Sequence, residues 1–112
     1  MYPSGAWKGF WDQSANGRQE MRGLTLRFVG GTVEGKGRDM VGRFTFRGRY
    51  DDQGHVTMVK QYVGRHQVIY EGRYDGEGTI FGQWSIDDMG WGKFALSPVR
   101  ARPAPDAPIE PL

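Results

Sequence analysis

The sequence contains no cysteine among its 112 residues, so disulfide bonds and thiolate metal ligands are excluded. It also has no apolar run near the ~20 residues that a membrane-spanning helix requires. Its first residues lack the basic start and apolar stretch of a secretory signal. Two histidines without any cysteine argue against a metal centre. These absences predict a cytoplasmic protein with no membrane contact, no metal and no cofactor.

An excess of charge of one sign is lacking too. Fifteen Lys and Arg face thirteen Asp and Glu, which leaves a net charge of +2. The chain has none of the dense basic runs that are typical of nucleic-acid-binding arms, so nucleic acid is not an expected partner. Arg43, Arg47 and Arg49, with Arg73 nearby, are interpreted as a solvated outer face with local acidic partners.

Alternation of apolar and polar side chains is the main positive signal. Leu24, Leu26 and Phe28 alternate with polar residues or glycine, as do Phe44 and Phe46, and no segment shows a helical period. Short turns rich in Gly and Asp separate these runs, and they include the ranges 30–31, 51–54, 63–65, 75–78 and 87–90. The chain is therefore predicted to be all-β, an up-and-down antiparallel meander that closes into a barrel of about eight strands.

Domain boundaries follow from composition. Residues 1–97 are predicted to form the single barrel domain, with a first strand over 5–13 lying beside a last strand over 91–96. Residues 98–112 are rich in Pro and Ala and poor in large apolar side chains, so they are predicted to be an extended or disordered tail. The segment 48–54 recurs almost unchanged at 72–78, which indicates one strand-and-turn unit used twice.

Register can be inferred across each turn from the requirement that apolar residues share one face. The predicted inward pairs are Phe46–Lys60, Lys60–Val68, Met58–Tyr70, Tyr70–Trp84 and Trp84–Phe94. The predicted outward pairs are Val59–Ile69 and, across the turn at 30–31, Arg27–Glu34. An apolar pair and an opposite-charge pair are both favourable across strands, which supports this register.

Short motifs resemble known barrels. The segments 46–51 and 70–74, followed by 80–84, resemble the strand ends of avidin-like proteins, and Gly5-Ala6-Trp7 resembles the opening of avidins and of calycins generally. The same opening also resembles small uncharacterised bacterial proteins that begin Gly-x-Trp-x-Gly. The resemblance implies a barrel over about residues 5–96. It does not imply biotin binding, because Gly9 and Gln13 stand where avidins carry the Asn and Ser that hold the ureido group.

A polar barrel mouth is the first candidate site. Inward parity places Lys60, Tyr62, His66 and Tyr70 near one end, together with Trp84, and Asp39 should reach the same end. An inward ammonium is costly unless it is paired with an anion. One possibility is a small anionic or aromatic ligand bound at the mouth. The other is that Asp39 pairs with Lys60 or His66 and closes the barrel.

The outer face is the second candidate site. Val59, Ile69, Phe81 and Trp91 carry outward parity, and the first two are adjacent by pairing, so they are predicted to form a subunit interface. Trp7, Trp11 and Trp84 are expected to fill the core. No inward Ser or Cys accompanies His66, so no catalytic residue is assigned. Two functions remain open: a small-ligand-binding barrel, or an interaction module that assembles through its outer face.

Overall fold

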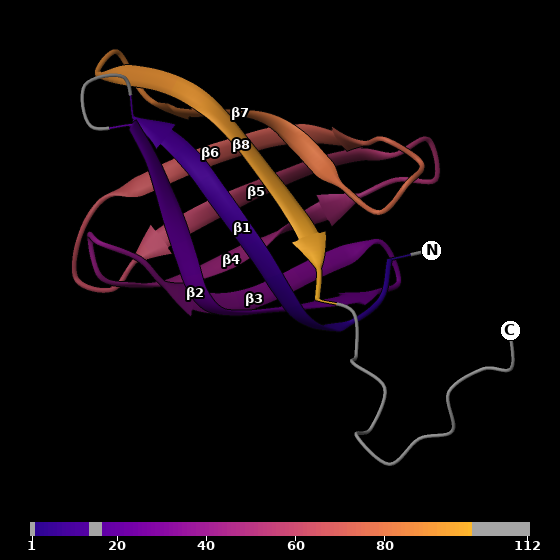
Figure 1. Ribbon diagram of the computed structural model, residues 1–112. Helices are drawn as coiled ribbons and strands as arrows, with labels where there is room; N and C mark the ends of the chain where they lie inside the picture. Colours follow the sequence, from indigo (N-terminus) through magenta and orange to yellow (C-terminus); the bar gives the residue numbers. More distant parts are fainter. Residues whose placement is uncertain (1, 14–16, 100–112) are drawn as a thin grey trace, which may run out of the picture.

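A computed structural model describes residues 2–13 and 17–99, which form a closed antiparallel barrel of eight strands in sequence order (Figure 1). The strands are β1 Gly5–Gln13, β2 Gly17–Val29, β3 Thr32–Arg38, β4 Arg43–Tyr50, β5 His55–Tyr62, β6 Gln67–Tyr74, β7 Ile80–Ile86 and β8 Gly90–Pro98. Each strand pairs with the next, and β1 pairs with β8 to close the barrel. The predicted all-β meander and its closure are therefore confirmed.

The predicted register is confirmed at all but one of the proposed pairs. Lys60 lies opposite both Phe46 and Val68, and Val59 lies opposite Ile69 on the outer face. Arg27 lies opposite Glu34 across the two-residue turn at 30–31. The agreement follows from the alternation itself, because a shift of one residue would move every core side chain of a strand to the outside.

The pairing of Trp84 with Phe94 is wrong. Trp84 lies opposite Gly92, and Phe94 lies opposite Gly82. The chain reverses one residue earlier than that pairing requires: the turn occupies residues 87–89, and Gly90 already pairs with Ile86. Asp87 adopts a positive φ of 39° there, a conformation that aspartate tolerates better than most residues.

The interior of the barrel is filled by side chains from every strand. Trp7, Trp11 and Trp84 are all less than a tenth exposed, which confirms that they belong to the core. The other large side chains that are almost completely buried include Leu24, Leu26, Phe44, Phe46, Met58, Tyr70, Ile80 and Leu96. An eight-stranded barrel encloses little more than the volume of its own inward side chains, so these residues leave little room inside.

The repeated segment forms the same turn twice at one end of the barrel. The side chain of Asp51 accepts hydrogen bonds from the backbone N–H groups of Gln53 and His55, each at 2.9 Å. Asp75 accepts the equivalent bonds from Glu77 and Thr79, at 2.7 and 3.1 Å. The aspartate therefore fixes the shape of the turn in both copies.

The same barrel end is covered by the segment before β1. The ring of Tyr2 packs on Phe28, Tyr50 and Tyr74 with centroids 4.8–5.2 Å apart. Pro3 accepts a hydrogen bond from the Trp7 indole at 2.8 Å, and Ser4 accepts one from the Phe28 N–H at 2.9 Å. These contacts hold an aromatic cap over the mouth, and sequence reasoning missed it because residues 2–4 carry no alternation.

The last strand extends to Pro98, one residue beyond the predicted end of the domain. Pro98 lies opposite Trp7, and the N–H of Val99 donates to the carbonyl of Ala6 at 2.9 Å. The remainder of the predicted tail, residues 100–112, lies outside the described residues.

Inward-facing glycines let neighbouring strands approach closely. A Cβ atom on Gly48 would collide with the carbonyl oxygen of Thr57 and would lie 2.6 Å from the Cα of Met58. A Cβ on Gly72 would lie 2.5 Å from the carbonyl oxygen of Phe81. These obstacles are backbone atoms, which cannot move aside without distorting the sheet, so glycine is required at both positions for steric reasons.

Replacing Gly48 with alanine should therefore destabilise the barrel, because the added methyl group forces β4 and β5 apart. We expect Gly48→Ala to lower the free energy of unfolding by about 2 kcal/mol or more, as overpacking does in other cores. Urea unfolding monitored by tryptophan fluorescence measures the change. Thr45→Ala, at an exposed position on the same strand, is the control and should cost less than about 1 kcal/mol. Equal costs for the two variants would show that space at Gly48 is not limiting.

Candidate functional site

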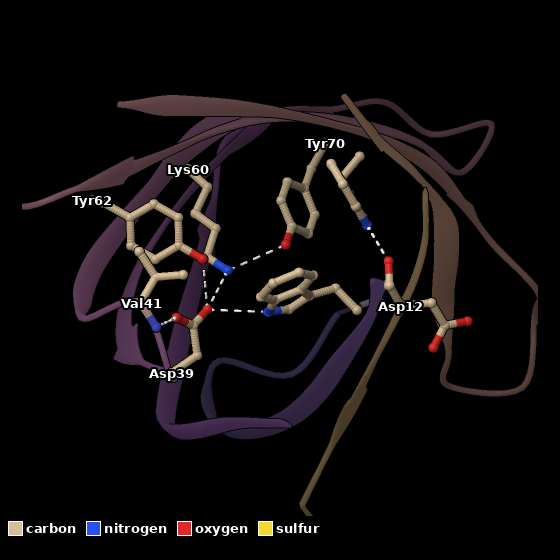
Figure 2. Close-up of polar contacts among 8 residues, drawn as sticks. Asp12, Asp39, Val41, Lys60, Tyr62 and Tyr70 are labelled. Carbon is tan, nitrogen blue, oxygen red and sulfur yellow. Dashed lines mark hydrogen bonds and ion pairs between the residues drawn. The ribbon is translucent and has the colours of Figure 1, made fainter. Parts of the chain in front are cut away.

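The end of the barrel opposite Tyr2 contains a buried cluster of polar side chains centred on Lys60 (Figure 2). Lys60 comes from the second half of β5, where its neighbours Met58 and Tyr62 also point inward. Its ammonium group is completely buried, with 0% of the side chain exposed. A buried charge of this kind requires a partner of opposite charge.

Asp39 supplies that partner from the turn between β3 and β4. Its Oδ2 atom accepts hydrogen bonds from Lys60 Nζ at 2.6 Å, from the Tyr62 hydroxyl at 2.7 Å and from the Trp11 indole at 3.2 Å. Its Oδ1 atom accepts the backbone N–H of Val41 at 3.0 Å. The carboxylate is as buried as the lysine, at 0% exposure. Of the two partners considered for Lys60, a bound ligand or Asp39, the structure contains Asp39.

The local sequence explains why the carboxylate turns inward. Asp39 and Gly42 exchange two backbone hydrogen bonds, at 3.0 and 3.1 Å, which makes a tight turn between the strands. Gly42 has a φ of 148°, a backbone angle that residues with a Cβ atom rarely adopt. The bond from Val41 to Oδ1 fixes the direction of the carboxylate across this turn.

The remaining surroundings of the ammonium are aromatic. Lys60 Nζ donates a hydrogen bond to the Tyr70 hydroxyl at 3.2 Å. It also lies 4.2 Å from the ring centroid of Phe44 and 4.8 Å from that of Tyr62, within the range of cation–π attraction. The cation is thus stabilised by one carboxylate, one phenol and the faces of neighbouring rings.

Burial controls the protonation of the cluster. Desolvation lowers the pKa of Lys60 to about 8, against the opposing effect of the hydrogen bond and the charge of Asp39. Desolvation also raises the pKa of Tyr62 and of Tyr70, and the negative charge of Asp39 adds to the effect in both. At neutral pH both phenols are therefore protonated, so that the Tyr62 hydroxyl can donate to Asp39.

Four of the six residues predicted at the mouth come together: Asp39, Lys60, Tyr62 and Tyr70. Trp84 is buried at the same end but does not join them. Its indole donates to the carbonyl of Asp12 at 3.1 Å, and its ring meets Trp11 edge to face.

His66 faces Tyr62 as predicted but takes no part in the buried cluster. His66 is exposed, although its backbone carbonyl pairs with the N–H of Tyr62 at 3.2 Å and its ring lies 5.1 Å from that of Tyr62. The residue precedes the first residue of β6, Gln67, so the alternation of the strand does not fix the direction of its side chain.

Trp11 is the member of the cluster that sequence reasoning placed only in the core. Its indole reaches Asp39 because β1 passes over the turn between β3 and β4, a relation between strands that are not paired with each other. Pairing rules connect neighbouring strands only. The available signal was the inward parity of an indole, whose N–H needs an acceptor when it is buried.

Only some of the predicted interface residues lie next to one another. Val59, Ile69, Ser85 and Trp91 follow one another across β5, β6, β7 and β8 as directly opposed residues on the outside. Trp91 is 65% exposed. Phe81 is 45% exposed, but it lies in another row, between Arg73 and Ala95. Three of the four predicted residues therefore share one strip.

One of the arginines interpreted as a solvated face, Arg47, has the expected acidic neighbour, whereas Arg73 contacts a histidine. Arg47 lies opposite Glu34. Arg73 contacts the ring of His55 at 3.0 Å, and His55 contacts Asp51 at 3.1 Å. Within the residues that the structure describes, no group of three or more His, Asp or Glu side chains could hold a metal ion.

Comparison with known proteins gives no match to a family model, to a curated protein or to a solved structure. The class that the structure defines is a small closed barrel of eight antiparallel strands. The likeness to avidins and calycins stays a prediction. Over the described ranges, no helix long and apolar enough to cross a membrane is found.

Removing the charge of Lys60 should be costly. In Lys60→Met, the carboxylate of Asp39 stays buried without its cation, and we expect a loss of about 3–5 kcal/mol in the free energy of unfolding at pH 7. The double variant Lys60→Met/Asp39→Asn should recover part of this loss, because no unpaired charge is left. Urea unfolding of both single variants and the double variant gives the coupling energy. A Lys60→Met variant as stable as the wild type would contradict the role of the pair.

The free energy of unfolding should also change with pH in the alkaline range. The unfolded lysine has its ordinary pKa of 10.5, while burial lowers that of folded Lys60 to about 8. Between these values the unfolded state binds more protons, so the contribution of Lys60 makes stability rise with pH. Above about pH 10 the raised pKa values of Tyr62 and Tyr70 act in the opposite direction, because the folded state then retains more protons.

Unfolding free energies measured at pH 7.5 and 9.5 test this dependence. The wild type should gain stability over that interval relative to Lys60→Met/Asp39→Asn, which lacks the titrating lysine. A constant difference would show that Lys60 keeps its ordinary pKa, and a difference that shrinks as the pH rises would show that folding raises it.

Proposed function

We propose that this protein is an interaction module that assembles with further copies of itself through the outside of the barrel, while the filled interior maintains the fold. The observation that carries the proposal is the ion pair at the mouth. The carboxylate of Asp39 lies 2.6 Å from Lys60 Nζ, in the position that an anionic ligand would have to take. An internal partner removes the physical need for a ligand at this lysine.

The other end of the barrel supports the same conclusion. The ring of Tyr2 is 8% exposed and covers the opposite mouth by stacking on Phe28 and meeting Tyr50 edge to face. A ligand would have to displace either this aromatic cap or the Asp39 turn. Binding of a small anionic or aromatic ligand inside the barrel is therefore the weaker of the two functions.

The strip formed by Val59, Ile69 and Trp91 is the proposed contact surface. Opposed residues on neighbouring strands lie about 5 Å apart, so the three side chains and Ser85 between them form one continuous band on β5 to β8. Trp91 is 65% exposed although it is the largest apolar side chain of the band. Burial of tryptophan is among the most effective ways to stabilise a protein–protein contact. A two-fold contact would bury the band of each copy against the other.

Light scattering as a function of concentration tests this assembly. The wild type should form a dimer or larger oligomer, and Val59→Lys should shift it to monomer, because a charge within the band loses its hydration on contact. The melting temperature of Val59→Lys should stay close to that of the wild type. Thr25→Lys, an exposed outward position on β2, is the matched control and should leave the assembly unchanged.

Two results would argue against the proposed contact. One is a wild type that remains monomeric at the highest concentration tested. The other is an equal effect of Val59→Lys and Thr25→Lys, which would indicate a response to net charge and not to the band.

A further inference from the structure

Three arginines lie side by side on the outside of β2, β3 and β4. Arg22 is directly opposite Arg38, and Arg38 is directly opposite Arg43. All three are exposed. Like charges that face each other across strands destabilise a sheet, and none of the three has an ion pair with another described residue. The row therefore presents three unneutralised guanidinium groups within one small area.

A second row on the same three strands has charges of alternating sign. Arg27 on β2 and Arg47 on β4 both lie opposite Glu34 on β3, so the charge alternates from strand to strand. The two rows lie on the same outer face. The missing carboxylate in the first row is thus a local feature and does not reflect the composition of the sheet as a whole.

A groove of about 510 Å³ runs along the arginine row. Four cationic residues, Arg22, Lys36, Arg38 and Arg43, line it, and none of the described residues that line it is acidic. The remaining lining residues are Gly23, Gly37, Phe44, Thr45 and Val63. Clefts of this size accommodate small molecules.

The nearest carboxylates form no ion pair with the row. Asp39 follows Arg38 in the chain, but its carboxylate is buried against Lys60 inside the barrel. Asp12 contacts Arg18 at 3.2 Å. Glu20 lines an adjacent groove together with Arg22 and Arg38 but has no ion pair with them. The internal ion pair thus removes one of the acids adjacent to the row from the surface.

We propose that this groove binds a small anion that carries two or more linked phosphate groups. Neighbouring strands are about 4.8 Å apart, so Arg22 and Arg43 are separated by about 10 Å at the backbone, more than a single phosphate spans. Guanidinium groups bind phosphate through paired hydrogen bonds. A chain of phosphates can engage all three arginines and remove their mutual repulsion.

The groove favours such a small ligand over nucleic acid. Proteins that bind single strands without sequence preference stack bases on exposed aromatic rings. The aromatic residue of this groove, Phe44, is only 1% exposed and cannot offer a ring face to a base. The whole chain also has a net charge of only +2.

Isothermal titration calorimetry with inorganic tripolyphosphate tests the proposal on the full chain. We expect one binding site per chain and weaker binding at high salt. Arg38→Gln should lower the affinity by about tenfold or more, because it removes the central guanidinium group. Arg47→Gln makes the same change of charge on the neighbouring strand and should leave the affinity within about twofold. Orthophosphate should bind more weakly than tripolyphosphate.

Thermal melts of the same variants separate a binding role from a structural one. Arg38→Gln removes two unfavourable neighbours, so its melting temperature without ligand should equal or exceed that of the wild type. Arg47→Gln loses the attraction between Arg47 and Glu34, so its melting temperature should not exceed that of the wild type. If Arg38→Gln instead melts below Arg47→Gln, the row stabilises the empty protein and the proposal fails.

Other outcomes would also overturn the proposal. These are the absence of tripolyphosphate binding, an equal loss of affinity in both variants, and orthophosphate binding as tight as that of tripolyphosphate. A single-stranded oligonucleotide that binds more tightly than tripolyphosphate, and loses affinity in Arg38→Gln, would assign the groove to nucleic acid instead.

Discussion

The ion pair between Lys60 and Asp39 determines the arrangement of one whole end of the barrel. The alternation of β5 directs Met58 and Tyr62 into the core, and Lys60 between them has to follow. A carboxylate must then enter the interior, and the turn between β3 and β4 folds inward to bring it there. The hydroxyl of Tyr62 and the indole of Trp11 complete the environment of that carboxylate. A buried pair of this kind seldom adds net stability over an apolar alternative, but it specifies a single arrangement of the groups around it.

Glycine and large side chains complement each other inside the barrel. Phe46 lies opposite Gly35, Phe44 opposite Gly37 and Met58 opposite Gly48. Trp84 and Phe94 lie opposite Gly92 and Gly82 in the same manner. Each large side chain thus projects over a position where the facing strand has no side chain. This complementarity explains how a chain of 112 residues with 18 glycines and four tryptophans builds a dense core within a narrow barrel.

The sequence allows most of the fold to be predicted because alternation and short turns are local signals. They give the strand order, the inward direction of Lys60 and the pairing of Val59 with Ile69. They fail where the outcome depends on distant strands or on loops. Trp11 meets Asp39 only because of the stagger of the closed barrel. Arg22 and Arg38 become neighbours only after an irregularity in β2 between Arg22 and Thr25. His66 lies just before β6, so the alternation of that strand does not fix the direction of its side chain.

The seam between β1 and β8 differs in kind from the other pairings. Seven pairings join strands that follow each other in the chain, whereas this one joins residues such as Gly9 and Leu96, which are separated by almost the whole domain. The loss of chain entropy on contact formation grows with the length of the intervening loop, so the hairpins are kinetically favoured and the seam is the slowest contact to form. Because β1 also carries Trp11 over Asp39, we expect closure of the seam to complete the exclusion of water from the charged pair.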